Sequence, residues 1–234
     1  MKILANDGID VSAVEQDEHL PTGIAIIYVS DEGENSIGIS AEANGALTPA
    51  VVKCHEALIA GAHTLLLQLE VPLESVQEAA RLARAHGTRV VLNPAPARPL
   101  SRDLLALVDL ITPNQTEAEL LTGVKVSDEA SAAEAAARFH QMGIADVMIT
   151  LGSQGVYCSN GQQQSLIPGF RVEAVDTTAA GDTFVGGFAA ALAHGKSEAE
   201  AIRFGQVAAA LSVTRAGAQP SIPTLHDVQG FVPS

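Results

Sequence analysis

Aromatic side chains are scarce in this sequence. Its 234 residues include 6 Phe, 2 Tyr and no Trp, although hydrophobic residues make up 47% of the chain. A buried core must therefore be built mainly from Ala, Val, Leu and Ile. A chain of this length lies at the upper end of what one α/β core holds. We therefore expect a single domain over residues 1–234.

Basic residues are also few. The sequence has 13 Lys and Arg against 27 Asp and Glu, which gives a formal net charge of -14. Such a surface repels polyanions, so we do not expect nucleic-acid binding. Any anionic ligand must be held locally, by backbone amides or a few placed side chains. The two cysteines, Cys54 and Cys158, form no C-x-x-C pair, which indicates a reducing compartment and no metal cluster.

Long hydrophobic runs are missing. No stretch reaches the roughly 18 to 20 apolar residues that a membrane-spanning helix needs. Residues 1–8 contain one lysine and a very short apolar run, without the hydrophobic region of a secretory signal. We therefore expect a cytoplasmic protein that makes no membrane contact.

From Pro49 onward, helical patterns alternate with short apolar runs, which predicts a parallel sheet covered by helices. The expected helices span residues 49–59, 72–86, 114–121, 129–142, 181–193 and 198–213; the expected strands span residues 64–69, 89–92, 110–111, 147–150 and 170–175, with a hairpin around Asn160 and Gly161. The first 48 residues differ. Residues 23–29 and 36–40 are strand-like and flank a turn at 31–35, so they predict a hairpin at an edge or flap.

The most specific motif is DTTAAGDTF at residues 176–184, between an expected strand and an apolar-periodic helix. Ala180 and Gly181 are small enough for a ligand to approach the backbone, and their amides fall at a helix start, which favours an anion. Asp182 in the first turn could accept a proton from a hydroxyl nucleophile, as phosphoryl transfer requires. The alternative is that Asp182 only interacts favourably with the helix dipole.

This motif resembles the C-terminal signature of the ribokinase family of carbohydrate kinases. Further matches follow in order along the chain: LQLE at 67–70, NPAPA at 93–97, TPNQTE at 112–117, TLGSQG at 150–155 and TRAGAQPS at 214–221. The resemblance covers essentially the whole chain. It implies a Rossmann-like α/β fold, with a mostly parallel sheet flanked by helices and a partial β lid at residues 22–42.

The resemblance also implies a reaction. Asp182 would deprotonate a primary sugar hydroxyl for attack on the γ-phosphate of ATP, and the amides of Ala180, Gly181 and Asp182 would stabilise the developing charge. The preferred substrate is ribose, giving ribose 5-phosphate, with another sugar or a nucleoside as the alternative. Glu70, at the end of an expected strand, would bind sugar hydroxyls together with Asp182. Otherwise Glu70 is a solvated acid before a helix.

Two roles are open for the Asn114-x-x-Glu117 spacing. On spacing alone, a capping box is favoured, with Asn at the N-cap and Glu at N3. The resemblance implies that both residues help to hold Mg²⁺ near the ATP phosphates, which suits a cation that keeps its waters. The two roles do not exclude each other.

Two further ligand sets follow from the resemblance. The residues implied to bind the nucleotide are Asn114, Thr150, Gly152, Ser153, Gln154, Gly155, Gly181 and Gln206. Those implied to bind a monovalent cation, K⁺, mostly through main-chain carbonyls, are Asp176, Thr178, Ser212, Arg215, Gly217 and Ser221. For residues 150–155 an ordinary hairpin turn is the alternative, because Gly and Ser populate turns.

One family feature is absent from this sequence. Ribokinases carry a GGKGAN-type glycine motif preceded by a sugar-binding aspartate, and neither occurs here. We therefore expect a chain that lacks the family's N-terminal quarter. The second hypothesis is accordingly a catalytically silent nucleotide-binding module. Family members often dimerise through lid strands, so a homodimer is possible.

Overall fold

The computed structural model describes residues 2–29 and 35–232. Its main sheet has six strands in the order β3-β4-β5-β6-β7-β8. The strands are β3 (Thr64–Leu67), β4 (Arg89–Leu92), β5 (Leu110–Ile111), β6 (Asp146–Thr150), β7 (Gly155–Ser159) and β8 (Gln164–Pro168). The first four are mutually parallel, whereas β7 and β8 are antiparallel neighbours. The mostly parallel sheet and the hairpin around Asn160 are thereby confirmed.

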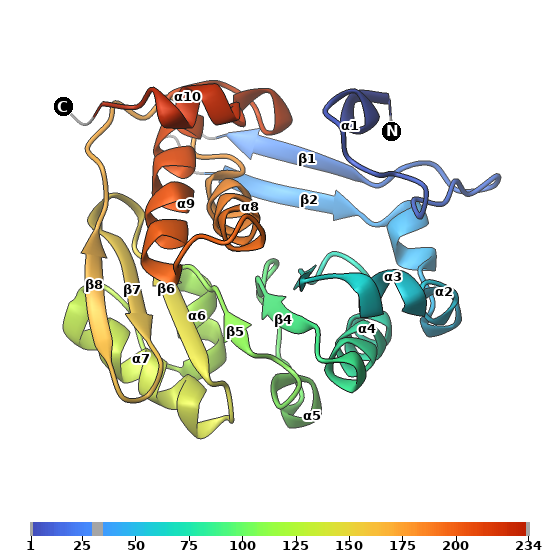
Figure 1. The fold of residues 1–234 in the computed structure, drawn as a ribbon, viewed down its shortest axis with the longest axis horizontal. Coiled ribbons are helices and arrows are strands. Elements are labelled where there is room, and N and C mark those ends of the chain that lie inside the picture. The colour runs from blue at the N-terminus through green and yellow to red at the C-terminus, as the bar shows by residue number, and fades with distance from the viewer. Residues whose placement is uncertain (1, 30–34, 233–234) are drawn as a thin grey trace.

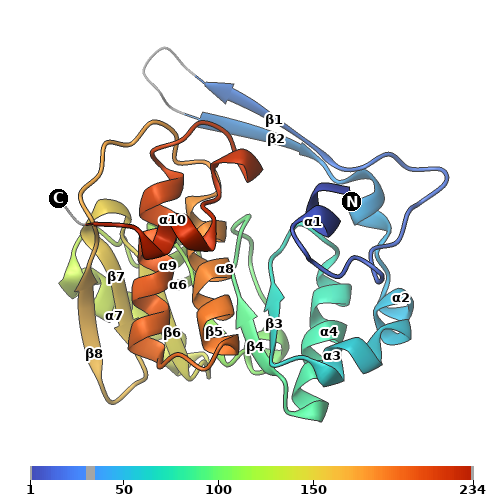
Figure 2. The same ribbon diagram turned by 45° about the horizontal axis from the view of Figure 1, so that its top comes forward.

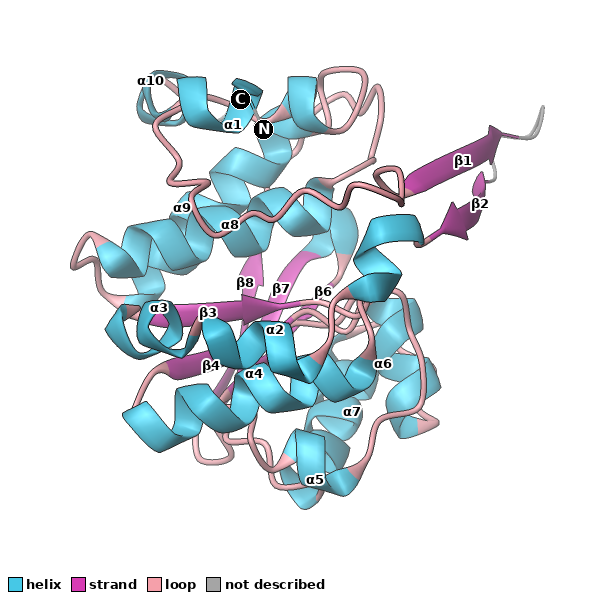
Figure 3. Ribbon diagram, turned by 90° about the vertical axis from the view of Figure 1, so that its right-hand side faces the viewer, coloured by secondary structure: helices cyan, strands magenta, loops and turns pink. Residues whose placement is uncertain are grey.

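Helices cover both faces of this sheet (Figures 1 and 3). One layer holds α2 (Pro49–Cys54), α3 (Glu56–Gly61), α4 (Leu73–His86), α5 (Arg102–Leu105), α6 (Gln115–Thr122) and α7 (Glu129–Gln141); the other holds α8 (Ala180–Ala193) and α9 (Glu198–Ser212). Alternate strand residues supply the two cores. Val90 and Leu92 belong to the core beneath α4, whereas Val91, between them, packs in the core with Phe184 and Phe188 of α8.

Several predicted helix ends are confirmed. The hydroxyl of Thr48 accepts a hydrogen bond from Val51 N at 3.3 Å, which caps α2. Gly87 ends α4 in the left-handed conformation, with φ +76°. The single helix expected over residues 49–59 is wrong, because the chain leaves helical geometry at His55 and begins again as α3. The side chain of His55 lies 3.2 Å from a carboxylate oxygen of Glu15.

The expected strand at residues 170–175 is also wrong, since residues 169–179 form no strand. The amides of Val175 and Asp176 both donate to the Val213 carbonyl, at 2.7 and 3.1 Å, instead of to a neighbouring strand. Val175 is 65% exposed, so its apolar side chain is not part of the core. The pattern did not predict the short helices α1 (Lys2–Asn6), α5 and α10 (Leu225–Gln229) or the 3₁₀ turns η1 (Glu42–Ala46), η2 (Gly152–Gln154) and η3 (Gln219–Ser221).

The N-terminal hairpin forms a separate two-stranded antiparallel sheet of β1 (Ile24–Val29) and β2 (Asn35–Ser40). Most of the turn expected at 31–35 lies outside the described residues. Figures 2 and 3 show the hairpin projecting on the side toward which β3 points. Ile24, Ile26 and Ile39 are each at least half exposed. Within the described part of the chain, no helix is long and apolar enough to cross a membrane.

Candidate active site

The carboxyl edge of the parallel strands gathers several predicted site residues. Glu70 follows β3, Asn114 follows β5 and Thr150 ends β6. Asn114 and Thr150 lie side by side, joined by an isolated parallel bridge, and Thr150 N donates to the Pro113 carbonyl at 2.9 Å. Ligands of open α/β sheets bind along this edge. The fold therefore places three of the predicted residues where a substrate would lie.

The segment that carries Glu70 is tied to the neighbouring proline-rich loop. Leu69 N donates to the Ala95 carbonyl and Asn93 N donates to the Leu67 carbonyl, each at 2.8 Å. Glu70 itself is exposed, and its amide donates to the side chain of Gln68. The carboxylate of Glu70 is thus free to face solvent or a ligand at the strand end.

The start of α8 has the geometry of an anion site. Ala179 is one of two described non-glycine residues with positive φ, at +60°, and it turns the chain into the helix. The first helical bond runs from Thr183 N to the Ala179 carbonyl, so the amides of Gly181 and Asp182 precede the helical ladder. A Cβ added to Gly181 would meet no atom within 4 Å, which leaves the approach open. The Ala180 amide differs, because it donates to the Thr177 carbonyl at 3.2 Å.

The carboxylates of Glu117, in the first turn of α6, and Asp182, in the first turn of α8, lie near each other. Burial raises the pKa of Glu117, which is only 8% exposed, the Asn114 amide lowers it, and the negative charge of nearby Asp182 raises it further. Asp182 itself is exposed. The structure thus brings Asp182 near the Asn114–Glu117 motif. Glu117 lies 65 residues earlier in the sequence, and its helix α6 belongs to the other helical layer.

The capping box at Asn114 and Glu117 is confirmed. Glu117 N donates to Asn114 Oδ1 at 2.9 Å, while the backbone N and Nδ2 of Asn114 donate to the two carboxylate oxygens at 2.8 and 2.9 Å. The ion pairs found in the described residues do not include Glu117. A nearly buried carboxylate with a second carboxylate beside it fits a hydrated divalent cation.

The turn at residues 152–155 packs tightly against the end of β8. Gly155 has φ +114°, and a Cβ there would lie 2.0 Å from the Ile167 carbonyl oxygen. Gly152, Ser153 and Gln154 are exposed at the carboxyl edge. Turn geometry thus explains Gly155 without a ligand, while its three neighbours remain available to one.

Gln206 lies on α9 and contacts the end of β8. It is 6% exposed, and its Nε2 donates to the carbonyls of Ile167 and Pro168 at 3.0 and 3.3 Å. Its side chain therefore holds the end of β8, against which the turn at residues 152–155 packs.

Three of the residues expected to bind a monovalent cation, Asp176, Thr178 and Gly217, are joined by hydrogen bonds. Asp176 joins two segments, because its carboxylate accepts hydrogen bonds from the amides of Thr178 and Gly217, each at 2.9 Å. The Thr178 hydroxyl, followed by these two amide bonds, lowers the pKa of Asp176. Ser212 and Ser221 are buried. Arg215 instead pairs with Asp227 of α10 at 3.4 Å.

Carboxylates, thiols and imidazoles do not cluster in threes to suit a metal anywhere in residues 2–29 and 35–232. A cation at the Asp176 loops would accordingly rely on main-chain oxygens, as the resemblance implies.

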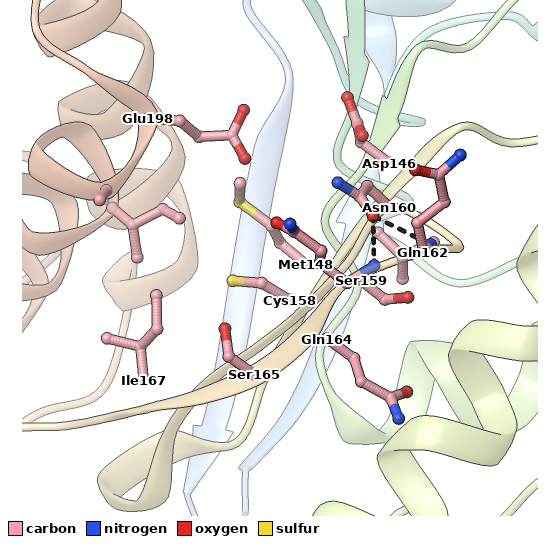
Figure 4. A pocket seen from close by; sticks show the side chains of 14 residues that line it. Asp146, Met148, Cys158, Ser159, Asn160, Gln162, Gln164, Ser165, Ile167 and Glu198 are labelled. Carbon is pink, nitrogen blue, oxygen red and sulfur yellow. Dashed lines mark hydrogen bonds between the residues drawn. The ribbon is translucent and has the colours of Figure 1, made fainter.

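A cavity of about 700 Å³ lies elsewhere, at the amino edge of the sheet (Figure 4). It is bordered by Asp146 at the start of β6, Cys158 near the end of β7 and Glu198 at the start of α9. Burial raises the pKa of the Cys158 thiol to about 12, so the thiol stays protonated. The predicted site residues do not line this cavity.

Sequence reasoning missed two features of the candidate site. The positive φ of Ala179 carried no signal, since alanine disfavours that conformation. Arg203 was missed as well, although its spacing from Gln206 puts both on one helix face. Arg203 Nη1 donates to Gln206 Oε1 at 3.4 Å.

Comparisons with known proteins agree with this geometry. Residues 1–225 match the model of the pfkB family of carbohydrate kinases. Ribokinase of Haemophilus influenzae is 54% identical over 97% of this chain and 74% of its own length, and ribokinase of Staphylococcus aureus is 45% identical over 94% and 73%. The structure of Arabidopsis thaliana ribokinase complexed with ribose and ATP is 32% identical, with a TM-score of 0.88 over 95% of this chain and 72% of that one.

The fold and the helix-start site thus define a carbohydrate kinase, and the chain belongs to the pfkB family. Within that family it is similar to ribokinases, and it spans about three quarters of their length.

Proposed function

We propose that this chain transfers the γ-phosphoryl group of ATP to the primary hydroxyl of D-ribose, giving D-ribose 5-phosphate. The observation that carries the proposal is the start of α8, where two amides that precede the helical ladder stand beside an exposed carboxylate, Asp182. Identities of 45–54% to two ribokinases support ribose as the acceptor.

Asp182 acts as the general base. An exposed carboxylate accepts the proton of the sugar hydroxyl as the hydroxyl oxygen attacks phosphorus. The amides of Gly181 and Asp182 donate to the phosphate oxygens, on which negative charge accumulates. The Ala180 amide supports this arrangement through its bond to Thr177 and does not donate to the phosphates.

Asn114 and Glu117 hold the hydrated Mg²⁺ of the nucleotide. When bound, Mg²⁺ neutralises phosphate charge and thereby makes the γ-phosphorus accessible to an oxygen nucleophile. Glu117 is suited to this role because it is nearly buried and close to Asp182. The capping box aims the Glu117 side chain while leaving Asn114 exposed.

The nucleotide lies along the turn at residues 150–154, with Gln206 behind it, and the sugar lies against Glu70 and Asp182. K⁺ is held by the loops that Asp176 joins, where the ionised carboxylate adds negative charge. The hairpin at residues 22–42 serves as a partial lid of the single kinase domain. Its exposed Ile24, Ile26 and Ile39 support dimerisation through this lid.

The two free cysteines, Cys54 and Cys158, support action in the reducing cytoplasm. Dimerisation is tested separately by light scattering of the full chain, with Ile26→Ser as the variant. A dimer that becomes monomeric in the variant supports the lid contact, whereas a monomeric wild type contradicts it.

The decisive experiment measures ADP release from Mg-ATP with and without ribose and K⁺. Asp182→Asn should lower kcat by about 10²- to 10⁴-fold, the contribution of a positioned general base. Asp103→Asn is the matched control, because Asp103 also occupies an exposed helical first turn. Ribose-dependent turnover that survives in Asp182→Asn would refute the assignment.

A second candidate is a silent nucleotide-binding module, favoured by the absence of a GGKGAN-type motif from the sequence. In that case ATP raises the melting temperature, but ribose elicits no turnover. A panel of other pentoses, hexoses and nucleosides in the same assay distinguishes a different acceptor from silence.

A further inference from the structure

The short segment 167–170 lies between two parts of the proposed nucleotide site. On one side it contacts the turn at 152–155, where Gly169 N donates to the Gln154 carbonyl at 3.3 Å. A Cβ on Gly169 would lie 2.8 Å from the Ser153 carbonyl oxygen. Because backbone packs directly against backbone, a shift of segment 167–170 must shift the turn.

On its other side, the same segment is held by α9. Arg203 Nη1 donates to the Pro168 carbonyl at 3.2 Å, and the guanidinium carbon lies 3.7 Å from the centre of the Phe170 ring. Phe170 in turn meets Phe231 edge-on, with 4.9 Å between ring centres. Gln206 adds its bonds to the Ile167 and Pro168 carbonyls. One cation thus connects a carbonyl, an aromatic face and the amide of Gln206.

We propose that Arg203, stacked on Phe170, is a positioning residue for nucleotide binding: it fixes segment 167–170 and thereby the turn that faces the nucleotide. The inference rests on the proposed function only in taking an adenine nucleotide as the ligand.

The surroundings of Arg203 separate this role from core packing. Its side chain is exposed on α9, whereas the neighbours that anchor the helix, Ala201 and Ile202, are buried. Removing the guanidinium therefore leaves the core intact and releases only the loop. A lysine keeps a cation over the ring, but it lacks the planar fork that reaches three partners at once.

The first test is calorimetric titration of the full chain with ADP in saturating Mg²⁺ and in the absence of sugar. Loss of a stacked, charge-assisted contact should make Arg203→Ala bind ADP about tenfold more weakly. Arg203→Lys should recover part of that loss. Arg138→Ala is the matched control, an exposed helical arginine whose ion pair with Glu134 spans 3.9 Å. It should bind ADP as the wild type does.

Steady-state kinetics supplies the readout that a merely structural role would not move. Arg203→Ala should raise the KM for ATP about tenfold while the KM for ribose and kcat change by less than about twofold. Phe170→Leu, which removes the aromatic face at similar volume, should change the kinetics in the same way. Phe170→Tyr, which keeps an aromatic face, should have the kinetics of the wild type. These two variants also replace Arg203→Ala if that protein does not fold.

The inference is overturned if Arg203→Ala binds ADP like the wild type, if Arg138→Ala is weakened equally, or if the wild type binds no ADP. It is also overturned if both KM values rise together. If the wild type binds ADP with the expected variant pattern but phosphorylates no acceptor, the proposed function fails and the positioning role stands.

Discussion

The conformation of Ala179 gives opposite expectations for the same substitution at two adjacent positions. Ala179 has φ +60°, where an L-residue is disfavoured by about 1–2 kcal/mol and glycine is not. Glycine also loses about 0.5–1 kcal/mol more backbone entropy on folding. Ala179→Gly should therefore stabilise the protein by about 0.5–1 kcal/mol. For a chain of this size that raises the melting temperature by about 1–4 °C.

Ala180→Gly is the matched comparison, because Ala180 begins α8 and gains nothing from the freedom of glycine. It should destabilise the protein by about 0.5–1 kcal/mol. Denaturant unfolding of both variants measures the difference. Equal destabilisation by the two substitutions would refute the strain at Ala179. Relief of the strain should also lower kcat severalfold, because the more flexible backbone of Ala179→Gly holds the anion site less firmly.

Three further outcomes are expected. The folded state binds the Glu117 proton more tightly than the unfolded state does, so wild-type stability should fall as pH rises from the ordinary glutamate range through the raised pKa of Glu117. Thermal melts should show a flatter pH dependence of stability in Glu117→Gln. In the wild type, Mg²⁺ should oppose this loss of stability. Gly155→Ala forces a Cβ against the Ile167 carbonyl and should cost about 3 kcal/mol or more, whereas Gly161→Ala, with 3.9 Å of clearance, should cost about 1 kcal/mol in the same melts. Leu66 is 43% exposed on β3, so Leu66→Thr should change the unfolding free energy by less than about 1 kcal/mol and should reduce aggregation measured by light scattering. Leu65 packs against the core, so Leu65→Thr should lower the unfolding free energy by about 2 kcal/mol.

The regular elements that position the site were predictable because their signals are local. Apolar runs located β4 and β6, and Asn114 with Glu117 marked the start of α6 through the spacing of a capping box. The strand expected at 170–175 failed for the converse reason. The amides at the end of this segment, Val175 and Asp176, donate to the Val213 carbonyl at the end of α9, a contact that no local pattern encodes.

The arrangement of the site was only partly predictable. Parallel strands place Glu70, Asn114 and Thr150 at one edge, so their proximity follows from the fold class. The approach of Asp182 to Glu117 does not, because it depends on how the α8 layer crosses the sheet. The stack of Arg203 on Phe170 likewise joins a helix to an irregular loop.

The charges of this chain constrain how it can hold a nucleotide. With a net charge of -14 and the Asp182 and Glu117 carboxylates close together, the bare site repels a polyphosphate. The amides at the start of α8 offer only partial positive charge. Nucleotide binding at this edge therefore requires added positive charge between the carboxylates and the phosphates. ADP affinity should accordingly rise with Mg²⁺ in the wild type and respond much less in Glu117→Gln, as calorimetry at fixed ionic strength would show. Tight binding of free ADP without a divalent cation would contradict this electrostatic account.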